Sequence, residues 1–185
     1  MTATLWATYP YSRGHVHITG PNVSDPVDFK TGFFSDPEGA DVSQAMWAYK
    51  KQREIFRRMD TYRGEWAASH PPFSPESAAA STEVDRPAAD VANITYTAED
   101  DAVIEKWLRD NVGSTWHSMG TCKMAPYEAL GVLDPGLGVH GTEGLKVADL
   151  SMAPENVGAN TANTAFAVGE KAADLFIREL QALVA

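Results

Sequence analysis

An aperiodic stretch rich in proline, serine and alanine interrupts the chain between Trp66 and Asn93. It has neither the roughly 3.6-residue spacing of an amphipathic helix nor the alternation of a strand, so it predicts a long surface loop or linker. The chain on either side is too short to hold a complete core by itself, whereas 185 residues suit one domain. We therefore expect a single domain over residues 1–185, with an internal loop at 66–93.

Composition and charge exclude several classes of protein. Hydrophobic residues make up 44% of the chain and charged residues 22%, as in ordinary globular proteins. With 15 lysines and arginines against 25 aspartates and glutamates, the net charge of −10 leaves no basic surface for nucleic acid or an anionic membrane. No apolar run approaches the ~20 residues that cross a bilayer, and the first residues lack the features of a signal peptide. We expect a soluble chain with no nucleic-acid or membrane partner.

The spacing of apolar residues predicts a mixture of helices and short strands. Asp41 is the expected N-cap of the first helix, and Thr97 with Asp100 three residues later resembles a capping box. Five basic side chains give the first helix most of the local positive charge, and we interpret them as a solvated helix face: Lys50, Lys51, Arg53, Arg57 and Arg58. The expected elements are strands at 15–19 and on both sides of a turn at 141–144, and helices over 41–62, 97–112 and 164–183.

Cysteine and histidine usage gives little support to a metal site. The single cysteine, Cys122, excludes an internal disulfide framework and any zinc site with several cysteines. His15 and His17 lie on one face of an expected strand, but the spacing suggests no third ligand. We therefore expect no metal site.

His117 is the histidine with a local pattern typical of catalysis. It lies in an irregular segment between Trp116 and Gly120, where glycine allows the backbone to approach another group closely. Imidazole titrates near neutral pH, so it can accept a proton from a hydroxyl. The rival hypothesis is a nucleophilic Cys122, which would need a converging base and a third, orienting group; an inert buried thiol is the other alternative.

The segment before the last helix has two interpretations. Asn160 and Asn163 precede an apolar helical pattern, and asparagine is a preferred N-cap. The same position also suits function, because the first-turn N–H groups of a helix stabilise negative charge. An asparagine there can donate to an oxygen that becomes anionic during a reaction.

Six segments carry motifs that occur together in one known family. They are YPYSRG (9–14), AYKKQREIFRRM (48–59), STWHSMGTCKMAP (114–126), GVLDPGLGVHG (131–141), LKVADLSMAPENVGANT (145–161) and GEKAADL (169–175). In this order they resemble the C-terminal region of the glucose-methanol-choline (GMC) oxidoreductases, and are most similar to the fungal alcohol (methanol) oxidases within that family. The segments span nearly the whole chain.

The resemblance implies an FAD-dependent enzyme that oxidises a primary alcohol to an aldehyde. Hydride passes to the flavin, and oxygen is then reduced to hydrogen peroxide, so the implied partners are a small alcohol and oxygen. His117 matches the family's general base, and Asn160 matches the residue that binds the substrate oxygen. The positions that match flavin contacts are Trp116, Asp149, Leu150, Thr161 and Ala162.

The family's dinucleotide fingerprint is missing from this chain. Gly136 to Gly141 fit the letters G-x-G-x-x-G, but no apolar strand precedes them and no helix follows, so the match is a chance one. The resemblance therefore implies a partial GMC fold of the α/β class, whose N-terminal FAD-binding domain is absent. It would hold the α+β substrate-domain sheet with its covering helices, plus the last strand and helix of the FAD-binding domain.

Several departures bear on assembly and location. The chain is shorter than methanol oxidases after Met124 and near 70–93. The subunit contacts of the family, and the homo-oligomer that the complete enzyme could form, therefore do not transfer directly to this chain. The resemblance implies a peroxisomal or cytoplasmic protein, yet the final residues 183–185 are not a tripeptide of the Ser-Lys-Leu type. Without the FAD-binding domain, apolar surface should be exposed on the last helix around Phe166, Leu175 and Phe176.

Two alternatives to an active oxidase portion remain. The chain could be a truncated or split-gene fragment that has no catalysis of its own and depends on a partner with the FAD-binding domain. It could also be a small independent binding module that reuses the fold, although such a module gains nothing from keeping both His117 and Asn160.

Overall fold

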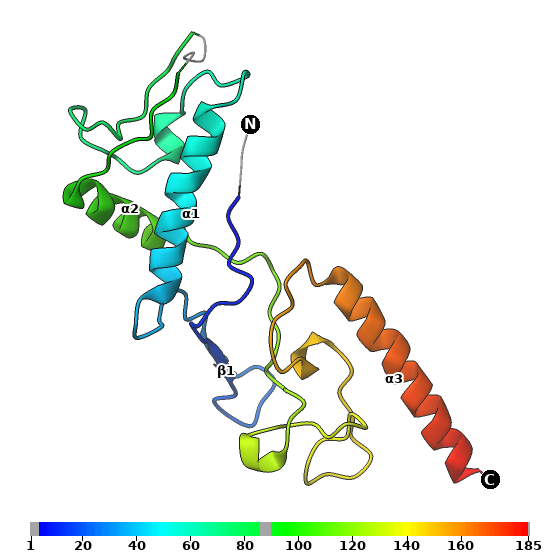
Figure 1. Cartoon of the computed structure of the whole chain (residues 1–185). Coiled ribbons are helices and arrows are strands. Elements are labelled where there is room, and N and C mark those ends of the chain that lie inside the picture. Colours follow the sequence, from blue (N-terminus) through cyan, green and yellow to red (C-terminus); the bar gives the residue numbers. More distant parts are fainter. Residues whose placement is uncertain (1–3, 86–89, 185) are drawn as a thin grey trace. The chain divides into compact units, whose positions relative to one another are not determined.

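The computed structural model describes residues 4–85 and 90–184, which form a mixture of helices and very short strands (Figure 1). The elements are β1 (His15–His17), β2 (Asp28–Lys30), α1 (Ala40–Arg57), α2 (Ala98–Asn111), α3 (Ala162–Leu183) and the single 3-10 turns η1 (Ala67–Ser69), η2 (Tyr127–Ala129) and η3 (Leu150–Met152). Two compact units emerge. In the described residues, the α1–α2 unit consists of residues 4–14, 30–85 and 90–113. The α3 unit consists of residues 15–29 and 114–184. The single domain over 1–185 stays a prediction.

Helices α1 and α2 pack against each other in the α1–α2 unit (Figure 1). The capping box is confirmed at the start of α2: the hydroxyl of Thr97 accepts from the N–H of Asp100, whose carboxylate accepts from the N–H of Thr97. Lys50 of α1 forms an ion pair with Asp101 of α2 at 2.5 Å. Ile104 is fully buried and anchors the apolar side of α2. Local capping and apolar burial therefore act together on α2.

Asp41 is not the N-cap of α1, so that expectation is wrong. The helix begins at Ala40, whose N–H donates to the carboxylate of Asp36 at 2.5 Å. The carboxylate of Asp41 instead accepts from the N–H groups of Tyr11 and Ser12, at 2.9 and 2.7 Å. Burial opposes its ionisation, but these hydrogen bonds outweigh it and lower the pKa of Asp41. Asp41 thus holds the N-terminal segment against the start of the helix.

Arg53 is not part of a solvated face, which corrects the interpretation of the basic side chains of α1. Its side chain is only 3% exposed and forms a two-pronged ion pair with Glu65, at 2.7 and 2.5 Å. It also donates to the carbonyl of Ala79 at 2.9 Å and to the hydroxyl of Tyr96 at 3.2 Å. Burial alone would lower the pKa of Arg53, but Glu65 raises it. The 66–93 stretch covers this face of α1 and thereby buries the guanidinium.

In the described part of the 66–93 stretch, regular structure is limited to η1 and an isolated bridge between Gly64 and Glu83. Gly64 has a φ of 97°, and a Cβ there would lie 2.3 Å from the carbonyl oxygen of Thr82. Glycine is therefore required where the chain turns back. Ala79 is fully buried, so the stretch contributes to the core as well as to the surface.

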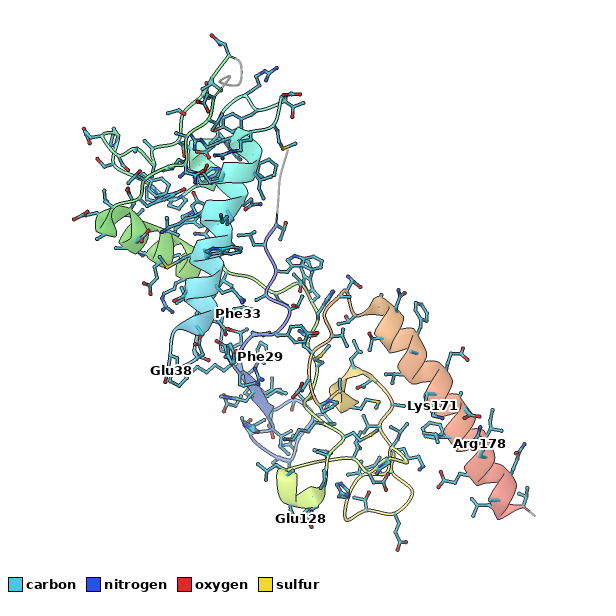
Figure 2. All side chains as sticks on the ribbon, in the orientation of Figure 1. Phe29, Phe33, Glu38, Glu128, Lys171 and Arg178 are labelled. Carbon is cyan, nitrogen blue, oxygen red and sulfur yellow. The ribbon has the colours of Figure 1, made fainter. Side chains whose placement is uncertain are left out.

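The α3 unit consists mainly of turns. Its sheet has the two three-residue strands β1 and β2, and Phe29 on β2 is 64% exposed (Figure 2). The expected strands around the turn at 141–144 form only isolated bridges, with the N–H of Val139 donating to Leu145 and that of Val147 donating to Leu137. Gly138 interrupts the first of these apolar runs, between Leu137 and Val139, which weakens a continuous ladder there. The larger substrate-domain sheet thus stays a prediction.

Helix α3 is confirmed, beginning two residues earlier than expected, and its side chains project along its whole length (Figure 2). Among its described residues only Ala172 is buried. Phe166 is 76% exposed, whereas Leu175 and Phe176 are half-buried, with the ammonium of Lys146 5.8 Å from the ring centre of Phe176. No helix in the described residues has both the length and the apolarity needed to cross a membrane.

Candidate active site

The segment after His117 lies beside η3 in the α3 unit. Three backbone hydrogen bonds join them: the N–H of Gly120 donates to Leu150, that of Cys122 to Ser151 and that of Met124 to Met152, at 3.3, 2.9 and 2.8 Å. Because η3 also contacts α3, these segments lie in one unit with the start of α3. Backbone hydrogen bonds thus join motifs about thirty residues apart in the sequence.

The residue before His117 has an unusual backbone conformation. Trp116 has a φ of 58°, in the left-handed region that a bulky side chain rarely adopts and that costs about 1–3 kcal/mol. Its N–H donates to the hydroxyl of Ser114 at 2.8 Å. The Trp116 side chain is 89% exposed, whereas both ring nitrogens of His117 are shielded from solvent. The tight turn therefore sends two adjacent side chains into different environments.

Ser114 is a residue that sequence reasoning missed. The available signal was a serine two residues before a main-chain N–H, the spacing at which a hydroxyl closes a local turn. That spacing is common in irregular segments and singles out no function. The Ser114 hydroxyl becomes notable only because the residue that it binds, Trp116, has a left-handed backbone conformation.

Asp149 lies at the N-terminal end of η3 and fixes its conformation. Its carboxylate accepts from the N–H of Ser151 at 2.8 Å. Hydrogen bonds from the hydroxyl and the N–H of Ser151 lower the pKa of Asp149. The group is therefore a carboxylate at neutral pH. Asp149 and Leu150, two of the expected flavin contacts, thus lie at the end of the backbone ladder that follows His117.

Asn160 lies immediately before the start of α3. Its side-chain oxygen accepts from the N–H of Ala162 at 2.9 Å. The N-cap of α3 is nevertheless Thr161, and Asn163 lies inside the helix, so the expectation of an asparagine N-cap is wrong. The amide nitrogen of Asn160 is then the atom that can donate to another oxygen. Thr161 is buried and provides no side-chain cap, and the first turn of α3 contains no acidic residue. The positive end of a 22-residue helix is thus not neutralised by a side-chain carboxylate of its own.

The G-L-G-V-H-G run cannot bind a dinucleotide in the way its letters suggest. The carboxylate of Asp134 accepts from the N–H groups of Gly136 and Gly138, at 2.8 and 2.9 Å. A phosphate would need such N–H groups, and here the chain's own carboxylate already occupies them. A bridge between Gly138 and Lys146 follows in place of a helix. The residues of this chain therefore do not fit the pyrophosphate of FAD at this loop.

The remaining candidates from the sequence are Cys122, His140, His15 and His17. No side chain in the described part of the chain hydrogen-bonds the sulfur of Cys122, whose N–H belongs to the ladder with η3. His140 lies 3.1 Å from the carbonyl oxygen of Ala125. The rings of His15 and His17 stack at 5.0 Å, and within residues 4–85 and 90–184 no group of three metal-binding side chains converges.

Comparison with known proteins identifies the family. Residues 10–169 match the family model for the C-terminal part of GMC oxidoreductases. An alcohol oxidase from Pichia angusta is 37% identical over 97% of this chain, and a choline oxidase from Arthrobacter globiformis is 30% identical over 91%. The solved structure of an FAD-dependent oxidoreductase from Chaetomium thermophilum matches 94% of this chain with a TM-score of 0.68 and 27% identity.

This chain covers only part of each relative: 34% of the alcohol oxidase, 27% of the choline oxidase and 26% of the solved structure. The alcohol oxidase alignment extends over 225 positions, so at least 40 of them have no counterpart among the 185 residues here. The choline oxidase alignment needs only 169 positions. The family model covers most of the chain, and the chain therefore belongs to the GMC oxidoreductases, a family of FAD-containing flavoproteins, and corresponds to their C-terminal region.

Proposed function

We propose that this chain is the C-terminal catalytic portion of an FAD-dependent oxidase that converts a primary alcohol to an aldehyde and oxygen to hydrogen peroxide. The observation that supports it most directly is the backbone ladder between the segment after His117 and η3. This ladder and the contact of η3 with α3 place His117, Asp149 and Asn160 in one unit. The similarity to the Pichia angusta alcohol oxidase favours an alcohol as the substrate class.

His117 is the proposed general base, and Asn160 the proposed binding partner of the substrate oxygen. The imidazole accepts the hydroxyl proton of the alcohol, a step that contributes on the order of 10²–10⁴ in rate. The amide nitrogen of Asn160 donates to the same oxygen as negative charge develops on it. FAD, if bound beside these residues, would supply the acceptor for the hydride of the alcohol carbon and the group that oxygen reoxidises.

The residues of this chain fit the flavin ring of FAD better than its pyrophosphate. An electron-rich ring suits the start of α3, where Thr161 and Ala162 lie and where no acidic side chain opposes negative charge. Trp116, Asp149 and Leu150 are the other proposed flavin contacts. The pyrophosphate needs a site elsewhere, because Asp134 fills the only glycine pattern of the right form in this chain. The proposed site for the pyrophosphate is therefore an FAD-binding domain outside these 185 residues.

A fragment with no catalysis of its own is the second candidate. Two observations favour it: the chain spans only 34% of the alcohol oxidase, and α3 exposes a series of apolar side chains. These are Phe166, Ile177, Leu180 and Leu183, all more than half exposed. An apolar surface of this kind is typical of a chain that packs against a partner. In this case activity appears only when the partner is present.

Reconstitution tests the proposed catalysis, and the isolated chain tests whether that catalysis requires the FAD-binding portion. The chain is purified alone and also coexpressed with the FAD-binding portion of the Pichia angusta alcohol oxidase; visible spectra are recorded before and after anaerobic addition of a primary alcohol. Flavin bands that bleach in the isolated chain identify an enzyme complete in itself. We expect a colourless isolated chain and a coexpressed complex that bleaches. A flavin-containing complex that no primary alcohol bleaches would contradict the proposed catalysis.

A further inference from the structure

The turn that contains His117 is held at both ends by hydrogen bonds. Downstream, the ladder begins where the N–H of Gly120 donates to Leu150 at 3.3 Å. Upstream, the hydroxyl of Ser114 accepts from the N–H of Trp116 at 2.8 Å. His117 lies between these two fixed points, one residue after the upstream one.

The upstream bond supports a conformation that has little other support. Trp116 has a φ of 58°, which L-residues with large side chains avoid. Packing does not hold it there, because its side chain is 89% exposed. A neighbouring hydroxyl that accepts from the N–H is a local means of stabilising such a turn. Loss of the hydroxyl should therefore let Trp116 return to an ordinary backbone conformation.

The backbone of Trp116 determines where His117 points, because rotation about one φ angle redirects everything that follows it. General-base catalysis depends on such placement: the base must lie within hydrogen-bond reach of the proton that it removes. We propose that Ser114 is a positioning residue for His117. Its hydroxyl holds Trp116 in the left-handed conformation and so keeps the imidazole in its shielded position. This inference rests on the proposed function of His117 as the base.

Ser114 differs in this respect from the other hydroxyls of the same segment. Thr115 is half-buried, Ser118 and Thr121 are exposed, and none of these three hydroxyls bonds to another described residue. The role is therefore specific to a hydroxyl two residues before Trp116. A threonine at this position keeps the same acceptor, which provides a conservative variant that should preserve the turn.

Amide exchange in the isolated full chain tests the contact without any activity. Ser114→Ala should speed exchange of the Trp116 N–H about three- to tenfold, because an ordinary hydrogen bond to it is lost. Ser114→Thr should leave the exchange rate unchanged. Equal Trp116 exchange in the parent chain and in Ser114→Ala would overturn the inference, whatever the chain catalyses.

Kinetics of the reconstituted complex test the consequence. Ser114→Ala should lower kcat about three- to tenfold with KM unchanged, and Ser114→Thr should restore kcat. Faster exchange in Ser114→Ala with an unchanged kcat would overturn the positioning role while His117→Ala still abolishes turnover and the proposed function stands. Full turnover in His117→Ala would remove the proposed function, and the positioning role with it, even if Ser114→Ala had sped exchange as expected.

Discussion

The α1–α2 unit and the α3 unit are built on different principles. The first has paired helices, a capping box and the buried ion pair of Arg53 with Glu65. The second contains the candidate catalytic residues, but it relies on turns, isolated bridges and one long helix of which only Ala172 is buried. The contrast indicates that side-chain contacts join the helices of the first unit, whereas in the second unit most of the long helix stays exposed.

The largest expected effect lies in the α3 unit, at His117. In the reconstituted complex His117→Ala should lower the rate of flavin reduction by an alcohol on the order of 10²–10⁴-fold, because the general base is lost. The unfolding midpoint of the chain should change little. His140→Ala, which alters a structural histidine of the same unit, serves as the control, and a comparable loss of rate there would contradict a specific role for His117.

The next effect lies in the α1–α2 unit, at its buried ion pair. Glu65→Gln leaves the guanidinium of Arg53 buried without its counter-charge and should destabilise the chain by about 3–5 kcal/mol in urea unfolding. The matched control is Lys106→Ala, which removes an exposed ion pair with Asp110 and should cost less than about 1 kcal/mol. If the two variants unfold at the same urea concentration, the ion pair does not support this unit.

A smaller effect is expected at the start of α2. Thr97→Ala removes the hydroxyl that accepts from the N–H of Asp100 and should cost about 1 kcal/mol of stability. Thr97→Ser keeps the cap and is the comparison variant. Exchange protection measured along the chain should fall in the first turn of α2; an equal fall throughout α3 would mean that the two units do not respond separately.

The smallest effect is a pH dependence in the α1–α2 unit. Burial lowers the pKa of His70 below its ordinary 6.5, and the hydroxyl of Tyr49 lies 2.9 Å from its Nδ1. The folded chain then binds fewer protons than the unfolded chain, so the stability present above pH 6.5 is lost as the pH falls through the folded-state pKa. Urea midpoints between pH 7 and pH 5 should therefore decline more in the parent chain than in His70→Gln. Parallel declines would contradict this assignment.

Local information predicted local structure well. The capping box of Thr97 and Asp100 and the course of α3 depend on residues a few positions apart, and both were predicted correctly. Asp41 was misassigned because its carboxylate binds Tyr11 and Ser12, about thirty positions away in the sequence. The residues next to Asp41 in the sequence give no sign that its carboxylate binds a distant segment, whereas Thr97 and Asp100 bind each other.

The same limit applies to side-chain burial and to the site. Arg53 has the same neighbours in the sequence as the other bases of α1, and only the fold of the 66–93 stretch buries it. His117 and Asn160 were predicted from motif resemblance, and their roles stay proposals. Ser114 could not be found this way, because its importance depends on one dihedral angle of Trp116.

The exposed side of α3 also affects the abundance of this chain in a cell. Chaperones and proteases continuously sort chains that are not fully folded, so changes of a few kcal/mol alter abundance several-fold. A copy in which Phe166, Leu180 and Leu183 stay exposed is a substrate for chaperones and proteases until another polypeptide segment covers these side chains. Under the proposed function, an FAD-binding domain packed against α3 would cover these side chains, and copies in which that domain is missing or misfolded would be removed before they accumulate.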